Sequence, residues 1–148
     1  MNKTIILSTI LALFFLVSCG GNGYDDDDTI SLSADSFATA YFNYDFEAAA
    51  RHATPETEKC LRFAASNVIE DDIEILRSQD EGAAVESGDV NRTSDSTAVL
   101  RCKVTNFLKR DTLGRPGHMV SKAYCTFGLV LRGSKWLVDV SSISFDKD

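Results

Sequence analysis

The chain has few of the residues that carry metal-dependent or nucleophilic chemistry. Its 148 residues include two histidines and four cysteines, and no two cysteines form a Cys-x-x-Cys pair. Neither histidine stands at ligand spacing from a cysteine, as a zinc site would require. Glycine-rich phosphate loops and the Gly-x-Ser-x-Gly and His-Glu-x-x-His motifs are also absent. The sequence therefore predicts no metal, no cofactor and no catalytic residue.

Positive charge is scarce as well. Fifteen lysines and arginines stand against 22 aspartates and glutamates, which gives a formal net charge of −7. Nucleic acids and anionic lipid surfaces are bound by basic faces. The charge balance therefore predicts no nucleic-acid partner.

The chain has no apolar run that could span a bilayer. The run from Ile5 to Leu16 is shorter than the roughly 20 apolar residues of a spanning helix. It follows Lys3 and ends at Leu16-Val17-Ser18-Cys19, and this arrangement resembles the signal peptide of bacterial lipoproteins. The resemblance implies that residues 1–18 are removed and that Cys19 is acylated, with palmitate among its acyl chains, in the cell envelope. Several acyl chains hold a protein firmly in a lipid bilayer, which is therefore an expected partner.

Residues 19–32 are expected to form a tether. Gly20–Thr29 is rich in glycine and then carries four consecutive aspartates, and such a segment buries too little apolar surface to order itself. An acidic run soon after the lipidated cysteine also resembles the surface-export signal of lipoproteins in the Bacteroidetes group. This resemblance implies an outer-membrane lipoprotein exposed at the cell surface. A periplasmic location and a plain spacer are the alternatives.

Residues 33–148 have the length of one domain, and the first half has helical periodicity. A first predicted helix follows Ser33 and carries apolar residues at helical spacing: Phe37, Ala40, Tyr41 and Tyr44. A second spans residues 46–53, with Asp45 as its N-cap. Thr54-Pro55-Glu56 predicts the start of a third helix, which we expect to extend toward Leu76.

The second half alternates with period two, as half-buried antiparallel strands do. Strands are predicted within residues 83–93, over 98–105, over 123–131 and over 136–142, the last two joined by a tight turn at Arg132-Gly133-Ser134-Lys135. This turn places Leu131 opposite Trp136, Leu129 opposite Val138 and Phe127 opposite Val140. A symmetric hairpin loop from Lys109 to His118 would place Cys102 opposite Cys125, within the range of a disulfide. Two free buried cysteines are the favoured alternative.

Three N-terminal helices packed on one face of a curved four-stranded antiparallel sheet form an α+β architecture. At this point the chain resembles the nuclear-transport-factor-2-like (NTF2-like), or cystatin-like, superfamily, and its lipoprotein branch of unknown function in particular. The resemblance lies in the aromatic helix from Phe37 to Tyr44, in the segment 44–49, and in Gly133-Ser134-Lys135-Trp136-Leu137-Val138. It implies a cone-shaped cavity between the helices and the sheet.

The small side chains at one end of the inner sheet face leave volume that must be filled, because protein interiors are close-packed. Close packing by the alanine-rich second helix is the favoured interpretation. The alternative is a pocket lined by Tyr41, Tyr44, His52, Cys102, Cys125 and Ser142. His52 has the chemistry of an acid or base near neutral pH, although packing is its commoner role. No inward strand position is acidic, because Asp139 falls on the outer face and Asp146 in the tail.

The loop from Lys109 to His118 is a basic cluster in an acidic protein. It has the charge to bind an anionic ligand, but a solvated hairpin tip is the favoured interpretation. Three functions remain open. The leading one is a non-enzymatic domain that binds a small apolar ligand or an envelope protein. The others are an isomerase-like or hydrolase-like enzyme and a structural module that forms a homodimer through the outer sheet face.

Overall fold

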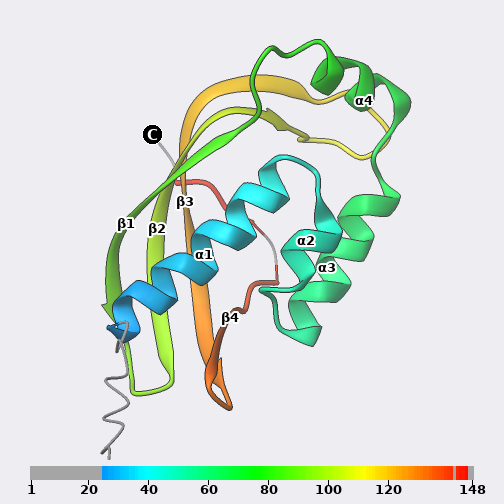
Figure 1. Ribbon diagram of the computed structural model, residues 1–148. Coiled ribbons are helices and arrows are strands. Elements are labelled where there is room, and N and C mark those ends of the chain that lie inside the picture. The colour runs from blue at the N-terminus through cyan, green and yellow to red at the C-terminus, as the bar shows by residue number, and fades with distance from the viewer. Residues whose placement is uncertain (1–24, 142, 147–148) are drawn as a thin grey trace, which may run out of the picture.

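The computed structural model describes residues 25–141 and 143–146. The predicted signal peptide, the lipidation site Cys19 and the pocket candidate Ser142 lie outside the described residues. Within them the chain forms four helices and then four strands (Figure 1): α1 (Asp26–Phe42), α2 (Phe46–Ala50), α3 (Pro55–Ser66), α4 (Glu70–Arg77), β1 (Ala84–Arg92), β2 (Thr97–Lys109), β3 (His118–Arg132) and β4 (Lys135–Val138). No helix in this part of the chain is long and apolar enough to cross a membrane.

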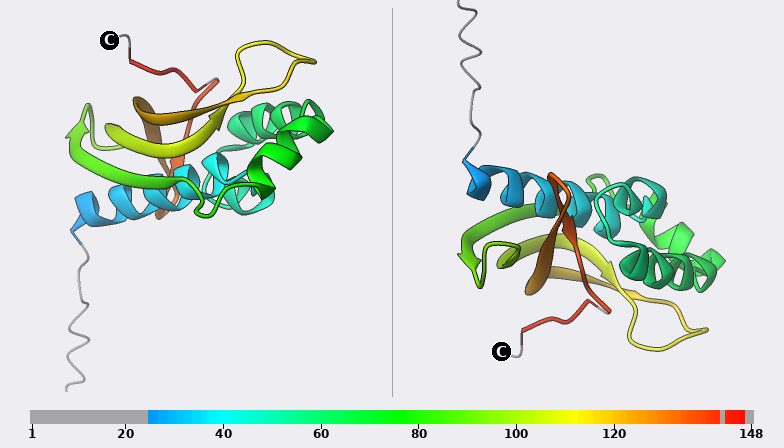
Figure 2. Two further views of the ribbon diagram at one scale, coloured as in Figure 1. Left: turned by 90° about the horizontal axis from the view of Figure 1, so that it is seen from above. Right: turned by 90° about the horizontal axis from the view of Figure 1, so that it is seen from below.

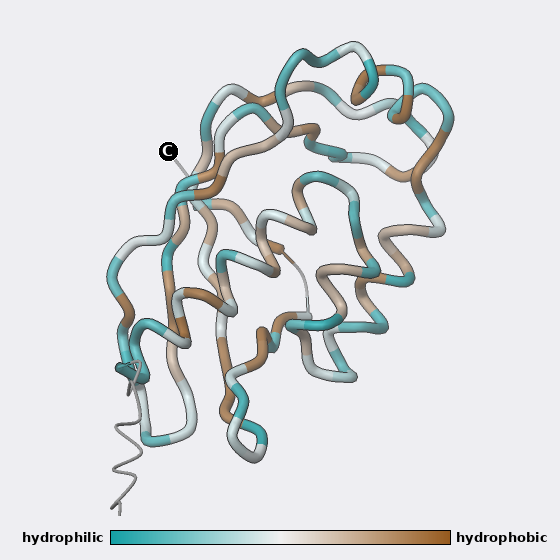
Figure 3. Tube along the Cα trace, viewed as in Figure 1, coloured by the Kyte–Doolittle hydropathy of each residue, from teal (hydrophilic) through white to brown (hydrophobic). Residues whose placement is uncertain are grey.

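The four strands form one antiparallel sheet in the order β1-β2-β3-β4. The predicted registers of Cys102 opposite Cys125, Leu131 opposite Trp136 and Leu129 opposite Val138 are confirmed. Alternate residues of β2 and β3 face the core and are fully buried, for example Leu100 and Phe127. Figure 3 shows the apolar positions along these strands and along α1. A register slip by one residue would expose all of them, so the apolar pattern fixes the pairing.

Helix α1 lies along one face of the curved sheet, and α2 and α3 lie beyond its C-terminal end (Figure 2). It buries Ile30, Ala34, Phe37 and Ala38 completely. The Ser33 hydroxyl donates to the Trp136 carbonyl at 2.8 Å and so ties the helix to β4. The α+β class and the four-stranded sheet are therefore as predicted.

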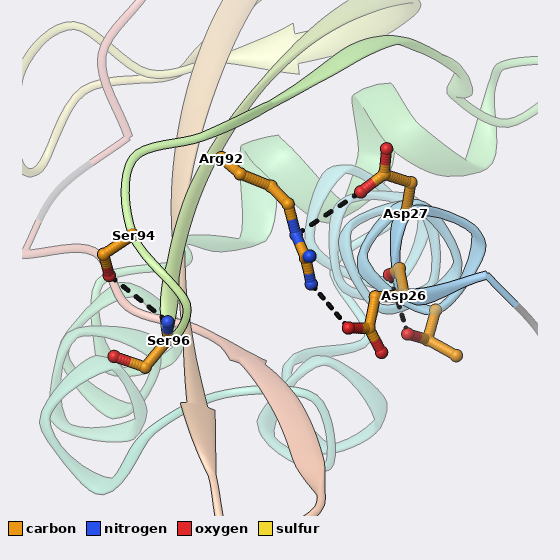
Figure 4. A network of polar contacts seen from close by, with 6 residues as sticks. Asp26, Asp27, Arg92, Ser94 and Ser96 are labelled. Atoms are coloured by element: carbon orange, nitrogen blue, oxygen red, sulfur yellow. Dashed lines mark hydrogen bonds and ion pairs between the residues drawn. The ribbon is translucent and has the colours of Figure 1, made fainter.

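The predicted helix start at Ser33 is wrong, because α1 begins at Asp26 and takes in the end of the expected tether. Three aspartates occupy its first turn, where the helix dipole favours negative charge. The Arg92 guanidinium contacts two of them, Asp26 at 2.7 Å and Asp27 at 3.5 Å (Figure 4). The acidic run is thus the start of a helix docked on the end of β1.

The number of helices also differs from the prediction. Helix α2 ends at Ala50 rather than residue 53, because Ala53 forms a parallel bridge with Val138. The long third helix is divided: α3 ends at Ser66 and α4 begins at Glu70. The division is stabilised by Asp72, which accepts a hydrogen bond from the Ile69 amide at 3.3 Å and caps the new helix.

The predicted pair of Phe127 with Val140 is not formed, because β4 ends at Val138. The Thr57 hydroxyl of α3 accepts from the Val140 amide at 2.8 Å and donates to its carbonyl at 3.1 Å. These bonds replace the ladder and turn the chain away from the sheet. Phe145 then returns beside Cys125, so this segment and α1, rather than α2, cover the end of the sheet with small side chains.

Candidate functional site

A cavity of about 540 Å³ lies between the C-terminal end of α1, α3, the chain after β2 and the segment after β4. Its volume is typical of small-molecule sites. Most of its wall is aromatic or aliphatic, and the polar side chains gather on α3 and on the β2–β3 loop. The lining includes Tyr41, Tyr44, Phe46, Lys59, Cys60, Phe63, Ala64, Lys109, Arg110, Asp111 and Leu113.

The apolar wall is built from aromatic rings in mutual contact. The Phe37 and Tyr41 rings stack with centroids 6.0 Å apart, and Tyr41 meets Phe46 edge to face at 5.7 Å. Phe145, which the sequence analysis did not single out, packs against Phe42 at 6.1 Å. Such pairs add to the energy of area burial and restrain the rings. The wall is therefore largely preformed.

The β2–β3 loop closes the polar side of the cavity because two long-range hydrogen bonds dock its flanks on α4 and on the turn after α1. The Tyr44 hydroxyl donates to the Leu108 carbonyl at 3.2 Å. Fully buried Asp72 of α4 accepts from the Gly117 amide at 2.8 Å. A Cβ at Gly117 would lie 2.7 Å from a backbone oxygen across the loop, so this close approach requires glycine. The predicted solvated tip is therefore docked at both flanks.

The docked loop fixes the position of Arg110, a polar residue of the cavity lining. Its Nη2 donates to the Ala64 carbonyl at 3.0 Å, and its guanidinium carbon lies 5.6 Å from the centre of the Tyr44 ring. Its Nη1 is buried and has no hydrogen-bond partner among the described residues. An unpaired buried donor costs on the order of 1–3 kcal/mol, and more when it is charged.

The charges around the cavity differ from those of the protein as a whole. Among the described residues, Lys59, Lys109 and Arg110 line it, and Asp111 is the single carboxylate of the lining. Asp111 is shared between Lys109 at 3.2 Å and His118 at 3.4 Å. A protein with a net charge of −7 thus has more basic than acidic side chains around this cavity.

Two of the six predicted pocket residues, Tyr41 and Tyr44, line the cavity. Burial raises the pKa of Tyr44 to about 12, although the nearby Arg110 charge opposes the shift. Burial also raises the pKa of Tyr41. Both hydroxyls therefore keep their protons at neutral pH. Tyr44 lies in the turn after α1, with a φ of 64°, and not on the helix as predicted.

The structure does not bring the predicted cysteines to the cavity wall. Cys102 and Cys125 are fully buried free thiols, so it gives no support to a disulfide between them. Burial raises their pKa values to about 11 and about 12 respectively, and neutral thiols are poor nucleophiles. Cys60 of α3 lines the cavity instead, with its Sγ 3.0 Å from the Ser141 carbonyl oxygen.

His52 does not line the cavity. Its carbonyl accepts from the Val138 amide at 2.8 Å, and partial burial, with Lys135 and Arg51 nearby, lowers the pKa of its imidazole. Asp45 caps α2, as predicted, by accepting from the Ala48 amide at 3.0 Å. Across residues 25–141 and 143–146 no three metal-ligating side chains form a cluster.

No protein-family description and no curated protein matches the chain. Solved structures do match. A proposed dehydratase of the NTF2-like family from Streptomyces avermitilis is 17% identical, with a TM-score of 0.47 over 76% of this chain and 90% of that one. An NTF2-like protein involved in plasmid conjugation is 12% identical, with a TM-score of 0.40 over 79% of this chain. The chain spans 47% of the length of that second protein. Both proteins are described as NTF2-like, which is the superfamily that this sequence resembles. The likeness concerns the fold alone.

Proposed function

We propose that this protein is a membrane-tethered envelope lipoprotein whose domain binds a small, largely apolar ligand without transforming it. The observation that carries the proposal is the cavity of about 540 Å³ with a wall of contacting aromatic rings. Pockets of this size with an apolar wall and a few polar groups are the usual form of small-molecule sites. A preformed wall also favours affinity, because little order is lost on binding.

The chemistry of the described lining favours binding over catalysis. General acid–base catalysis needs a group with a pKa near the working pH within reach of the substrate. The lining has one carboxylate, Asp111, which faces Lys109 and His118. The raised pKa of Tyr44 keeps its hydroxyl protonated at neutral pH and makes it a weaker acid. These groups suit recognition of a ligand better than proton transfer.

The tether forms part of the same proposal and rests on the lipobox-like segment that ends at Cys19. Asp26, the first residue of α1, follows Cys19 by seven positions, a span of at most about 25 Å of extended chain. An acylated Cys19 would hold the domain at the surface of the outer membrane, where apolar ligands partition. Replacing Cys19 by alanine should release the protein from the membrane fraction, and equal retention of both forms would contradict the tether.

The ligand-binding proposal is tested with full-length protein extracted in detergent from its own membranes. Bound small molecules are extracted with solvent and measured by mass spectrometry. Ala64→Phe adds a ring inside the cavity, whereas Ala65→Phe adds the same ring at an exposed position of α3 outside the lining. We expect the wild type and Ala65→Phe to retain the same ligand and Ala64→Phe to lose it. Equal retention by all three proteins, or none in the wild type, would contradict the proposal.

A further inference from the structure

We propose that the ligand of this cavity is an amphiphilic anion, whose oxyanion headgroup is bound by Arg110 and whose apolar body lies among the aromatic rings. This inference rests on the proposed function and adds the chemical class of the ligand. Three features of the described residues carry it: the geometry of Arg110, the charge of the lining and the form of the apolar wall.

Contacts with Ala64, Tyr44 and Gly117 hold the Arg110 side chain in place. Its Nη2 is bonded to the Ala64 carbonyl, and its plane lies near the Tyr44 ring. Its side-chain carbons pack beside Gly117, where an added Cβ would come within 3.0 Å of the Arg110 Cγ. Nη1 is buried without a partner among the described residues, and the Arg110 side chain is part of the cavity lining. A fixed, desolvated cationic donor is suited to an oxyanion, with which arginine forms strong charge-assisted hydrogen bonds.

The neighbouring charges leave Arg110 free for a ligand. Its nearest carboxylate along the chain, Asp111, is bonded to Lys109 and His118, and no ion pair among the described residues includes Arg110. Lys59 adds a further positive charge to the lining. A concave surface with an excess of one charge raises the local concentration of the opposite ion. The field in the cavity therefore favours an anion.

The rest of the wall favours an amphiphile over a small inorganic anion. The contacting rings of Tyr41 and Phe46 form an apolar part of the same lining. Phe63 and Leu113 line the cavity while 59% and 63% exposed, so apolar side chains continue to its solvent side. Large apolar side chains exposed beside a cavity are typical of a binding groove. One guanidinium with a buried nitrogen beside such a wall matches one headgroup on an apolar chain.

The primary test compares two probes that share a ten-carbon chain, decanoate and decanol. Full-length protein in maltoside micelles is titrated calorimetrically with each at pH 7.5, and empty micelles are titrated in parallel to subtract partitioning. A carboxylate loses more hydration than an alcohol on entering an apolar cavity, so tighter binding of decanoate requires a cationic partner. We expect decanoate to bind at least tenfold more tightly. Equal affinities, or a preference for decanol, would overturn the inference and leave the proposed function standing. Binding of neither probe would overturn both.

Variants then test the assignment to Arg110. Arg110→Gln should weaken decanoate about tenfold to a hundredfold and leave decanol nearly unchanged. Arg115→Gln removes an exposed charge of the same loop that is outside the lining and should change neither affinity. Arg110→Lys keeps the positive charge and should keep part of the preference for decanoate over decanol. If Arg110→Gln binds neither probe because its cavity has collapsed, the lysine variant tests the assignment instead. Full decanoate affinity in Arg110→Gln would overturn the assignment.

Discussion

The buried carboxylate of Asp72 should be one of the strongest single contributors to stability outside the apolar core. It accepts from the Gly117 amide at 2.8 Å and from the Ile69 amide at 3.3 Å, and it is fully buried. Asp72→Ala removes both bonds and leaves two amides without their acceptor. Hydrogen bonds to charged groups contribute about 1.5–3 kcal/mol each. The longer of these two is the weaker, so we expect a loss of about 3 kcal/mol.

For a domain of this size, such a loss lowers the melting temperature by roughly 10 °C. Urea unfolding followed by circular dichroism measures the free energy. Amide exchange should also rise across residues 109–118, because the Gly117 contact holds that loop on α4. Asp72→Asn keeps one acceptor oxygen and should lose about half as much.

The matched control is Asp71→Ala, which removes an exposed acid from the same turn of α4. It should change stability by less than about 0.5 kcal/mol. If Asp72→Ala were as stable as Asp71→Ala, neither the cap nor the docked loop would contribute what their geometry implies, and the reasoning would be refuted.

Three further predictions concern the loop and the buried thiols. Gly117→Ala should destabilise by about 1–3 kcal/mol in urea unfolding, since its Cβ would lie 2.7 Å from a backbone oxygen; an unchanged midpoint would contradict the close approach. Among Cys60, Cys102 and Cys125, iodoacetamide at pH 8 should label only Cys60 in the native protein and all three after unfolding without reductant. Mass spectrometry measures this, and protection of the other two after unfolding would reveal a disulfide. The free energy of unfolding should fall as the pH rises above about 9, because the thiols of the unfolded chain lose their protons there while burial raises the native pKa values of Cys102 and Cys125 to about 11 and about 12. A Cys102→Ala/Cys125→Ala variant should show a smaller dependence of stability on pH. Equal slopes in the two proteins would contradict the linkage.

The sheet was predictable because its register depends on local alternation and one tight turn. Pairing Arg132 with Lys135 aligns Leu129 with Val138, and a symmetric loop that pairs Lys109 with His118 aligns the two cysteines of β2 and β3. The prediction failed after Val138, where the hydroxyl of Thr57 competes with the ladder for the Val140 backbone. The alternation of apolar and polar residues cannot reveal this competition, because the hydroxyl comes from a helix that is distant in sequence.

The starts of α1 and α4 are marked in the sequence by acidic residues, but the composition around them conceals the first of these signals. Acidic residues fill the first turns of both α1 and α4, and negative charge at a helix N-terminus is favourable. Before α1 the same charges follow a glycine-rich segment, and together they resemble a disordered spacer. What decides the matter is the next turn, where Ile30 and Ser33 are buried against the sheet. An acidic run followed within one turn by buried residues is better interpreted as a helix start than as a tether.

The cavity was predictable only in part, because its polar side depends on docking between distant segments. Tyr41 and Tyr44 belong to the aromatic segment that the sequence singled out, and both line it. Arg110 belongs to the basic loop that the sequence also identified. Its orientation, however, follows from its bond to the Ala64 carbonyl and from the loop contacts to Tyr44 and Asp72. None of these pairs is local in sequence.

This dependence links ligand binding to the order of the loop. A headgroup bound to the Arg110 side chain would add a contact to the docked loop, and the free energy gained would stabilise that loop over any opened form. The linkage is reciprocal. The ligand must bind more weakly to the opened form, by the same factor by which bound ligand shifts the loop toward its docked form. Decanoate should therefore slow amide exchange across residues 109–118 in the wild type, and Asp72→Ala should weaken decanoate although Asp72 is outside the cavity lining. The affinity of the site is then set partly by the capped start of α4, which places the loop.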